Sequence, residues 1–284
     1  MSRDQNISVF LDTERSCSQD KVLVAAVSKS IEAEKVIREE DAIGEVNRHI
    51  YESPATITIS KKRTMEAAAS YTGQRAAVVL NFASATNPGG GVTRGSSAQE
   101  ECLCRVSTLF PCLNTPKTHK EFYLPHRHQS DPIHNDDIIY TPGVKVFKTD
   151  TDVPRLLPSD QWYDVNVITC AAPNLRENPR NQWNPDETGS AVKISDSQLL
   201  NVHLKRLRRI LDVTVAEGND TVILGAFGCG AFRNSPEVVA LAARTIVKEY
   251  LHAFKIIEFA IYCGPSNDRN YKVFDRILSP LKTK

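Results

Sequence analysis

Two adjacent carboxylates are the residues of this chain best suited to acid–base chemistry. Glu100 and Glu101 follow Gln99 at the start of "QEECLCRVSTLF", a stretch typical of a helix. Carboxylates in the first turn of a helix often do no more than stabilise the helix dipole. A carboxyl group in a desolvated cleft beside a second carboxylate has a raised pKa, however, and a general acid requires this. The pair therefore predicts a site in which one acid holds a sugar while the other donates a proton.

A run of three glycines precedes this pair, with seven residues between the run and Gln99. Because glycine has no Cβ, its backbone can approach a ligand more closely than any side chain would permit. Taken alone, such a run predicts only a flexible turn. Its place after an expected buried strand favours a binding loop, and the amide of the preceding asparagine can both donate to and accept from ribose hydroxyls. The candidate binding residues of this loop are Asn87, Gly89, Gly90 and Gly91.

A second glycine-rich stretch, "GAFGCGAF" at 225–232, has the order G-x-x-G-x-G. This differs from the G-x-G-x-x-G of dinucleotide-binding redox enzymes, and no G-K-[ST] element of nucleotide triphosphatases is present. Successive backbone N–H groups in such a loop nevertheless form a nest for a pyrophosphate without needing a lysine. Phe227 and Phe232 flank the loop. Each can pack on a ribose or base, although a phenylalanine after a strand more often belongs to the core.

Neither the histidines nor the cysteines have the spacing of a metal site. With no cysteine or carboxylate at ligand spacing, the four histidines of one segment are expected to be exposed loop residues. They are His119, His126, His128 and His134. Cys102 and Cys104 form C-x-C without a second pair, and the seven cysteines, an odd number, indicate reduced thiols, several of them buried. We expect no metal and no cofactor.

The composition excludes several classes of protein. The 284 residues are 41% hydrophobic and 24% charged, the proportions of a globular chain. A formal net charge of +1 does not favour direct, sequence-specific binding of nucleic acid. The first residues, "MSRDQNISVF", do not predict a signal peptide, and no apolar run approaches the roughly 18 residues of a membrane span. We therefore expect an intracellular, cytoplasmic protein without a membrane partner, nuclear if the source is eukaryotic.

Apolar periodicity predicts strands that alternate with helices, which is typical of an α/β fold with a largely parallel sheet. In such sheets ligands bind in the loops after the carboxyl ends of strands, and both glycine loops and "APN" (172–174) follow expected strands. The segments 111–142 and 174–195 are rich in Pro, Asn, Asp and His and are expected to be long surface excursions. The expected strands are 56–60, 76–83, 165–172, 221–227 and 256–263. The expected helices are about 19–50, 63–71, one opening at 99, 196–217, one opening at 235–236, and 271–278.

The glycine triplet, the spacer and "QEE" together resemble the signature of poly(ADP-ribose) glycohydrolases, closest to the microbial-type branch, from about residue 20 to the carboxyl terminus. The resemblance implies a macrodomain-like three-layer α/β/α sandwich with a mixed, largely parallel central sheet and an N-terminal helical extension. It divides the chain into an extension, 1–50, packed on a catalytic domain, 51–284, as a single structural unit. The spacer is more polar than is usual for the family.

The resemblance also implies roles for individual residues. Glu101 is the expected acid and base, and Glu100 and Asn87 hold ribose hydroxyls. The glycine triplet and the second glycine loop would cradle a diphosphate, and Tyr262 would stack on adenine. The residues implied to bind substrate are Asn87, Gly89, Gly90, Gly91, Gln99, Phe227, Gly228, Cys229, Gly230, Ala231, Phe232 and Tyr262.

The function implied is hydrolysis of the ribose–ribose bonds of poly(ADP-ribose), mainly from polymer ends, with ADP-ribose as the product. Two alternatives remain open at this point. The same cleft could remove single ADP-ribose units from protein or nucleic acid, or it could bind ADP-ribose without catalysis. A reader of ADP-ribose needs the glycine loops but not the acid pair, so the intact pair favours hydrolysis.

Overall fold

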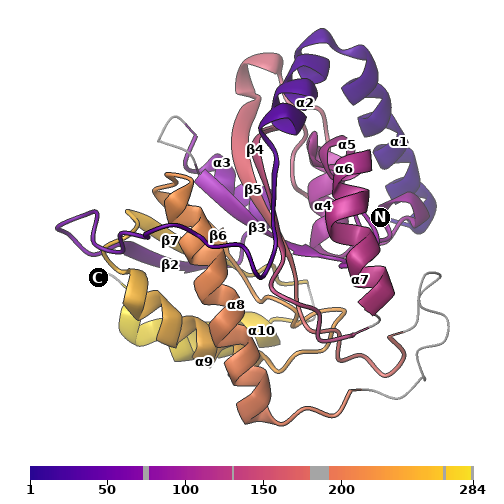
Figure 1. Cartoon of the computed structure of the whole chain (residues 1–284). Coiled ribbons are helices and arrows are strands. Elements are labelled where there is room, and N and C mark those ends of the chain that lie inside the picture. Colours follow the sequence, from indigo (N-terminus) through magenta and orange to yellow (C-terminus); the bar gives the residue numbers. More distant parts are fainter. Residues whose placement is uncertain (73–76, 130, 180–191, 265–266, 283–284) are drawn as a thin grey trace.

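A seven-stranded sheet lies between two groups of helices in the computed structural model, which describes residues 1–72, 77–129, 131–179, 192–264 and 267–282 (Figure 1). The strand order is β1-β4-β5-β3-β6-β7-β2. The pairs β1/β4 and β4/β5 are antiparallel, and the other four pairs are parallel, so the expected mixed, largely parallel sheet is confirmed. The strands are β1 (Lys35–Ile37), β2 (Thr56–Ser60), β3 (Ala77–Ala83), β4 (Ile138–Val146), β5 (Tyr163–Ala171), β6 (Thr221–Leu224) and β7 (Ile256–Ala260).

The centre of the sheet is the strand with the longest apolar run. In β3, six of the seven residues are buried, because this strand has a parallel neighbour on each side and helices on both faces. The strands β6 and β7 end earlier than the apolar runs predicted. Residues 225–227 and 261–263 therefore belong to loops at the carboxyl edge of the sheet.

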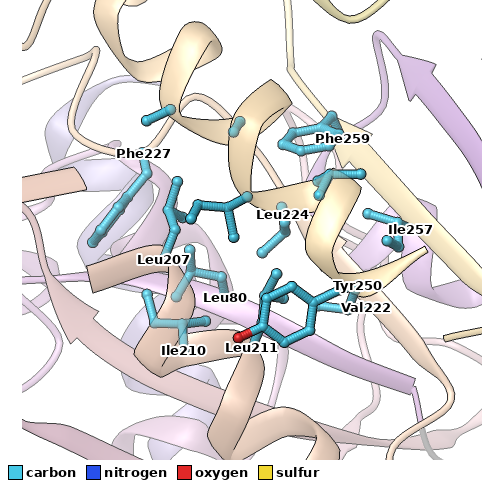
Figure 2. Packing of buried hydrophobic residues seen from close by; sticks show 14 of the residues in the cluster. Leu80, Leu207, Ile210, Leu211, Val222, Leu224, Phe227, Tyr250, Ile257 and Phe259 are labelled. Atoms are coloured by element: carbon cyan, nitrogen blue, oxygen red, sulfur yellow. The ribbon is translucent and has the colours of Figure 1, made fainter. Parts of the chain in front are cut away.

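Three helices pack on one face of the sheet: α8 (Asp196–Ala216), α9 (Pro236–Val247) and α10 (Arg269–Leu278). The helix α8 begins with a capping box, in which the N–H of Gln198 donates to Ser195 Oγ. Figure 2 shows how leucines and an isoleucine of α8 meet apolar side chains of β3, β6 and β7 in the larger of the two core clusters. Hydrophobic burial on this face holds the strand ends, and hence the loops that follow them, in fixed positions.

The other helices lie on the opposite side of the sheet (Figure 1). A second core cluster there joins Phe10 and Phe110, whose rings meet edge to face, to the inner side of β3, β4 and β5. A π-helical turn, His119–Tyr123, connects two of these helices. The helices are α1 (Arg3–Gln19), α2 (Lys21–Ala33), α3 (Thr64–Ala69), α4 (Gln99–Val106), α5 (Leu109–Leu113), α6 (Pro116–Thr118) and α7 (Leu124–Gln129).

The amino-terminal residues differ from the expected pattern. Of the stretch 19–50 that was predicted to be helical, only α2 is a helix; it ends at Ala33, and Lys35–Ile37 forms the edge strand β1 against β4. The helix α1 was not predicted, because its mean hydropathy is low and few of its residues are apolar. The first fifty residues thus contribute a strand to the sheet and Phe10 to the second core cluster.

The prediction that 111–142 is a surface excursion was wrong. The segment forms α5, α6, the π-helical turn, α7 and the start of β4, and Phe122 and Tyr123 are fully buried. His126 is also buried, and the Nδ1 of its ring contacts the carbonyl oxygen of Phe122 at 2.8 Å, so it is not an exposed loop histidine. His134 is largely enclosed, and this burial lowers its pKa to about 3. The helices were not predicted because each is too short to show apolar periodicity, and the proline-rich composition suggested a loop instead.

Of the second expected excursion, 174–195, residues 180–191 lie outside the described part of the chain. All seven cysteines are free thiols, and Cys17, Cys104, Cys112 and Cys170 are buried, as predicted. No helix in the described ranges is long and apolar enough to cross a membrane.

Candidate active site

One large cavity opens at the carboxyl ends of the central parallel strands. Its volume is about 1290 Å³, and the loops after β3, β5 and β6 all contribute to its wall. Both glycine loops and both members of the acid pair line it, so residues far apart in the sequence meet where parallel sheets place ligands. The amino terminus also reaches the cavity, through Met1 and through Arg3 and Asn6 in the first turn of α1.

Glu100 is almost completely buried, and both of its carboxylate oxygens have donors. The N–H of Ser84 donates to Oε2 at 2.8 Å, and Asn81 Nδ2 lies 3.4 Å from Oε1. Burial raises the pKa of Glu100 well above its ordinary value, and the charge of Glu101 raises it further. Hydrogen bonds from Ser84, Asn81 and the Gly89 N–H oppose this rise. Glu100 is thus a fixed carboxyl group with a strong tendency to keep a proton.

Glu101 is also buried, but it is held at only one of its oxygens. The N–H of Gly91 donates to Glu101 Oε1 at 2.8 Å, whereas Oε2 has no partner among the described residues. An unpaired buried oxygen is costly and is often found where a substrate group will bind. Of the two acids, Glu101 is therefore the one with an oxygen available for chemistry.

The glycine triplet is shaped by the two carboxylates. A Cβ added at Gly90 would lie 2.6 Å from Glu101 Oε1 and 2.9 Å from Glu100 Oε2. The φ of Gly90 is +60° and that of Gly89 is +64°, values that glycine adopts most readily. Glycine here permits the close approach of the backbone that the sequence predicted, but the partner is the protein's own acid pair.

The N–H groups of this triplet all have partners inside the protein. The Gly89 N–H bonds to Glu100, the Gly90 N–H to the Asn87 carbonyl oxygen and the Gly91 N–H to Glu101. The expectation that they face a diphosphate is thus not met in this structure, because the two carboxylates and the Asn87 carbonyl oxygen already accept from them.

Gln99 and Asn87 are likewise engaged with the protein. The Gln99 side chain accepts from the Phe82 N–H at 2.9 Å and donates to the Leu80 carbonyl oxygen at 2.8 Å. It therefore pins the start of α4 to the end of β3 and orients the two acids that follow it. Asn87 Nδ2 donates to the Gly90 carbonyl oxygen and closes the turn around the triplet.

The second glycine loop, by contrast, exposes its backbone donors. Within the described residues, the N–H groups of Gly228, Gly230, Ala231 and Phe232 have no acceptor. All four residues line the cavity. Left-handed backbone at Gly228 (φ +77°) and Arg233 (φ +57°) bends the loop in the way that produces an anion nest. The loop therefore has the backbone shape and the free donors that an anion nest requires.

A single asparagine holds that loop in shape. Asn234 Nδ2 donates to the Pro173 carbonyl oxygen at 2.6 Å and to the Gly228 carbonyl oxygen at 3.1 Å. His203 Nε2 donates to Asn234 Oδ1 at 2.8 Å, and burial lowers the pKa of His203 to about 4, so the ring stays neutral. The loop after β5 and the loop after β6 are thereby joined into one wall.

Tyr262 lies in another part of the cavity wall and is 44% exposed. The guanidinium of Arg63 lies 3.8 Å from the centre of its ring, and its hydroxyl donates to Asp152 Oδ1 at 3.0 Å. Arg63 also forms an ion pair with Asp152. Tyr262, held by these two side chains, is an aromatic platform at the cavity wall, of the kind that can stack on a heterocyclic base.

A family model for the catalytic domain of microbial-type poly(ADP-ribose) glycohydrolase (PARG) matches residues 10–149. The structure is similar to the crystal structure of PARG from Thermomonospora curvata, with a TM-score of 0.82 and 27% identity over 96% of this chain and 98% of that one. It is also similar to PARG from Deinococcus radiodurans in complex with ADP-ribose, with a TM-score of 0.76 and 30% identity over 90% of this chain and 98% of that one. The chain belongs to the microbial-type PARG family. None of the curated proteins matches it.

For this PARG family member, the structure gathers most of the predicted site residues but not all. Gly89, Cys229 and Phe227 do not line the cavity. Phe227 is completely buried and packs on Phe82 and His203, so its expected contact with substrate is wrong and the core alternative holds. The predicted residues that do line the cavity are Asn87, Gly90, Gly91, Gln99, Glu100, Glu101, Gly228, Gly230, Ala231, Phe232 and Tyr262.

Several residues of this PARG site were missed by sequence reasoning. Asn81 is a polar residue inside the buried run "AVVLNFA", and that anomaly could have marked it as a partner of the acids. Asn234 directly follows the second glycine loop, and a polar side chain at that place could have been suspected of holding the loop's backbone. Arg63, Asp152 and Asn6 gave no signal, because only the tertiary structure brings them to the cavity. Among the described residues, no group of three potential ligands is placed to hold a metal ion.

Proposed function

We propose that this protein hydrolyses the ribose–ribose O-glycosidic bonds of poly(ADP-ribose), acting mainly at polymer ends and releasing ADP-ribose inside the cell. One observation carries the proposal. Within the described residues, a single cavity holds a buried carboxylate with one oxygen unpaired, Glu101, and several backbone N–H groups without acceptors at the second glycine loop. An acid and a diphosphate nest in one cavity are the two elements that cleavage of an ADP-ribose glycoside needs.

In this proposal the second loop binds the diphosphate through the N–H groups of Gly228, Gly230, Ala231 and Phe232. The N–H dipoles offset the negative charge without a lysine or a metal ligand. The ring of Phe232 packs on the terminal ribose, and the adenine stacks on Tyr262, whose other contacts are with Arg63 and Asp152. The substrate then spans the cavity from the aromatic platform to the acid pair.

The acid pair divides the chemistry. Glu100, fixed at both oxygens, holds ribose hydroxyls together with Asn87 and keeps a proton within the pair. Glu101 donates its proton to the departing 2′ oxygen as the bond between that oxygen and the anomeric carbon breaks. Positive charge then develops on the anomeric carbon, and the bound diphosphate stabilises it. A water molecule attacks the carbon, and the Glu101 carboxylate takes the proton that this water loses.

The test is the substitution Glu101→Gln, which keeps the shape of the side chain but cannot transfer a proton. We expect the release of ADP-ribose from labelled polymer to fall by about 10² to 10⁴, because a positioned general acid contributes that much. ADP-ribose affinity, measured by calorimetry, should remain close to that of the unaltered protein, since the second loop is untouched. Glu45→Gln, on an exposed residue far from the cavity, is the matched control.

The same assay separates the alternatives. Polymer and mono-ADP-ribosylated protein are supplied side by side, and the products are resolved by chromatography. Turnover of the single unit alone would favour a mono-ADP-ribosyl hydrolase, and binding of ADP-ribose without turnover of either would favour a reader. If Glu101→Gln digests polymer at the parental rate, Glu101 is not the acid.

A further inference from the structure

The seven-residue spacer between the glycine triplet and Gln99, residues 92–98, is held by contacts from outside itself. Within the spacer, the Ser96 N–H donates to the Gly91 carbonyl oxygen at 3.1 Å, which ties the middle of the spacer to the end of the triplet. Gly91 in turn donates its N–H to Glu101 Oε1. If residues 95–96 move, Gly91 therefore moves with them, and the N–H of Gly91 is the group that orients the Glu101 carboxylate.

Two side chains fix the adjacent carbonyl groups of residues 95 and 96. Asn6 Nδ2, on α1, donates to the Gly95 carbonyl oxygen at 2.9 Å, and Arg105 Nη1, on α4, donates to the Ser96 carbonyl oxygen at 2.6 Å. A Cβ added at Gly95 would lie 2.4 Å from the Arg3 carbonyl oxygen, so the backbone of α1 touches the spacer directly. The helix and the spacer are packed as closely as two backbones can be.

The helix α1 is itself firmly anchored. Lys148 is almost fully buried, and its Nζ lies 2.7 Å from both Thr13 Oγ1 and Asp12 Oδ2. Thr13 Oγ1 also donates to the Arg105 carbonyl oxygen at 2.6 Å. A buried charge with these partners is strongly destabilised if they are removed, so it fixes the register of α1 on the domain. Asn6 is consequently a rigid support for the spacer.

We infer that Asn6 is a positioning residue for the reaction, acting on Glu101 through Gly95, Ser96 and Gly91. The inference rests on the proposed hydrolysis and assigns the amino-terminal helix a part in it. Asn6 does not transfer a proton; its amide holds the spacer in the one position that directs the Gly91 N–H at Glu101. Errors of about 1 Å in such a geometry lower turnover far more than they lower binding.

The test is Asn6→Asp in the full-length protein. The substitution keeps the size of the side chain but replaces the donor with an oxygen that repels the Gly95 carbonyl. We expect kcat on labelled polymer to fall by about tenfold to a hundredfold, with the ADP-ribose dissociation constant changed by less than about threefold. If Asn6→Asp does not fold, Asn6→Ser, which is too short to reach Gly95, is assayed in the same way.

Cys17→Ala is the matched control, because Cys17 is a buried residue of the same helix in a separate apolar cluster. It should lower the Tm of the protein while leaving kcat unchanged. The inference is overturned if Asn6→Asp retains the parental kcat, if its loss of kcat only matches that of Cys17→Ala, or if ADP-ribose affinity falls as much as kcat. The unaltered protein is assayed in parallel, and its failure to release ADP-ribose would contradict the proposed hydrolysis instead.

Discussion

The two glycine loops of the cavity look alike in sequence but are built in opposite ways. In the first, Gly90 is crowded by the acid pair, and the N–H groups of Gly89, Gly90 and Gly91 are all used inside the protein. In the second, Asn234 supports the loop from behind through backbone carbonyl oxygens. Its N–H groups are left without acceptors among the described residues.

The difference shows what glycine does in each loop. In the first loop the missing side chain makes room for carboxylates, so the loop serves catalysis. In the second it permits the left-handed turn at Gly228 in a loop whose N–H groups lack acceptors among the described residues, so we assign that loop to binding. A substitution in the first loop should therefore mainly lower the turnover of polymer, and a substitution in the second should mainly lower the affinity for ADP-ribose.

Gly90→Ala should have the largest effect. Its methyl group would lie 2.6 Å from Glu101 Oε1, and the positive φ adds backbone strain. We expect kcat on labelled polymer to fall by about a hundredfold or more, because the acid is displaced. ADP-ribose affinity should change much less. Gly44→Ala is the control, since no atom lies within 4 Å of an added Cβ there. If Gly90→Ala lowers ADP-ribose affinity more than it lowers kcat, the first loop cannot be assigned to catalysis and the second to binding.

Gly228→Ala, in the second loop, should weaken the binding of ADP-ribose. The added methyl group would lie 2.7 Å from Ala172 Cβ and from Asn234 Nδ2, at a φ of +77°. Strain of this kind costs about 1 to 3 kcal/mol, so ADP-ribose should bind about tenfold more weakly, with a smaller change in kcat at saturating polymer. Calorimetry with ADP as well as ADP-ribose checks the reason, because both carry the diphosphate. If ADP binds as well as before, the nest is not at this loop.

Turnover, which we assign to the first loop, should vary with pH more than ADP-ribose affinity, which we assign to the second. This effect should be smaller than those of the two substitutions. The folded-state pKa of Glu100 is raised, so its proton stabilises the fold at low pH, and this stabilisation is lost as the pH rises from the ordinary pKa of glutamate through the raised value. Turnover should decline over the same alkaline limb, because the proton that Glu100 keeps within the pair is lost. At the second loop, His203 has a pKa of about 4, and burial raises the pKa of the Cys229 thiol, so both stay neutral near pH 7.

Two measurements follow the pH prediction. The kcat on polymer and the free energy of unfolding are recorded from about pH 5 to pH 8, and ADP-ribose affinity over the same range. Affinity should be nearly flat, and Glu100→Gln should remove the alkaline decline in stability. Parallel pH profiles for affinity and turnover would contradict the assignment of one loop to binding and the other to catalysis.

Much of this site could be predicted from the sequence, because its signals are local. The strand Ala77–Ala83, the capped helix α8 and the acid pair at the start of α4 are short-range patterns, and the structure contains each of them. The helices between 111 and 129 could not be found in the same way, because each is too short for periodicity and is stabilised by tertiary burial of residues such as Phe122 and Tyr123. Phe227 was expected to contact the substrate but lies in the core, because only tertiary packing decides which way its ring points.

By itself, the sequence determined the alternation of strands and helices, the loops at strand ends and the identity of the two acids. Only the tertiary structure decided which oxygen of which acid is unpaired, which glycine N–H groups remain open, and that Asn6 reaches across 89 residues to Gly95. The reason is physical. Turns, caps and apolar faces depend on neighbours a few residues away, whereas hydrogen bonds inside a cavity depend on strand order and helix packing, which bring distant parts of the chain together.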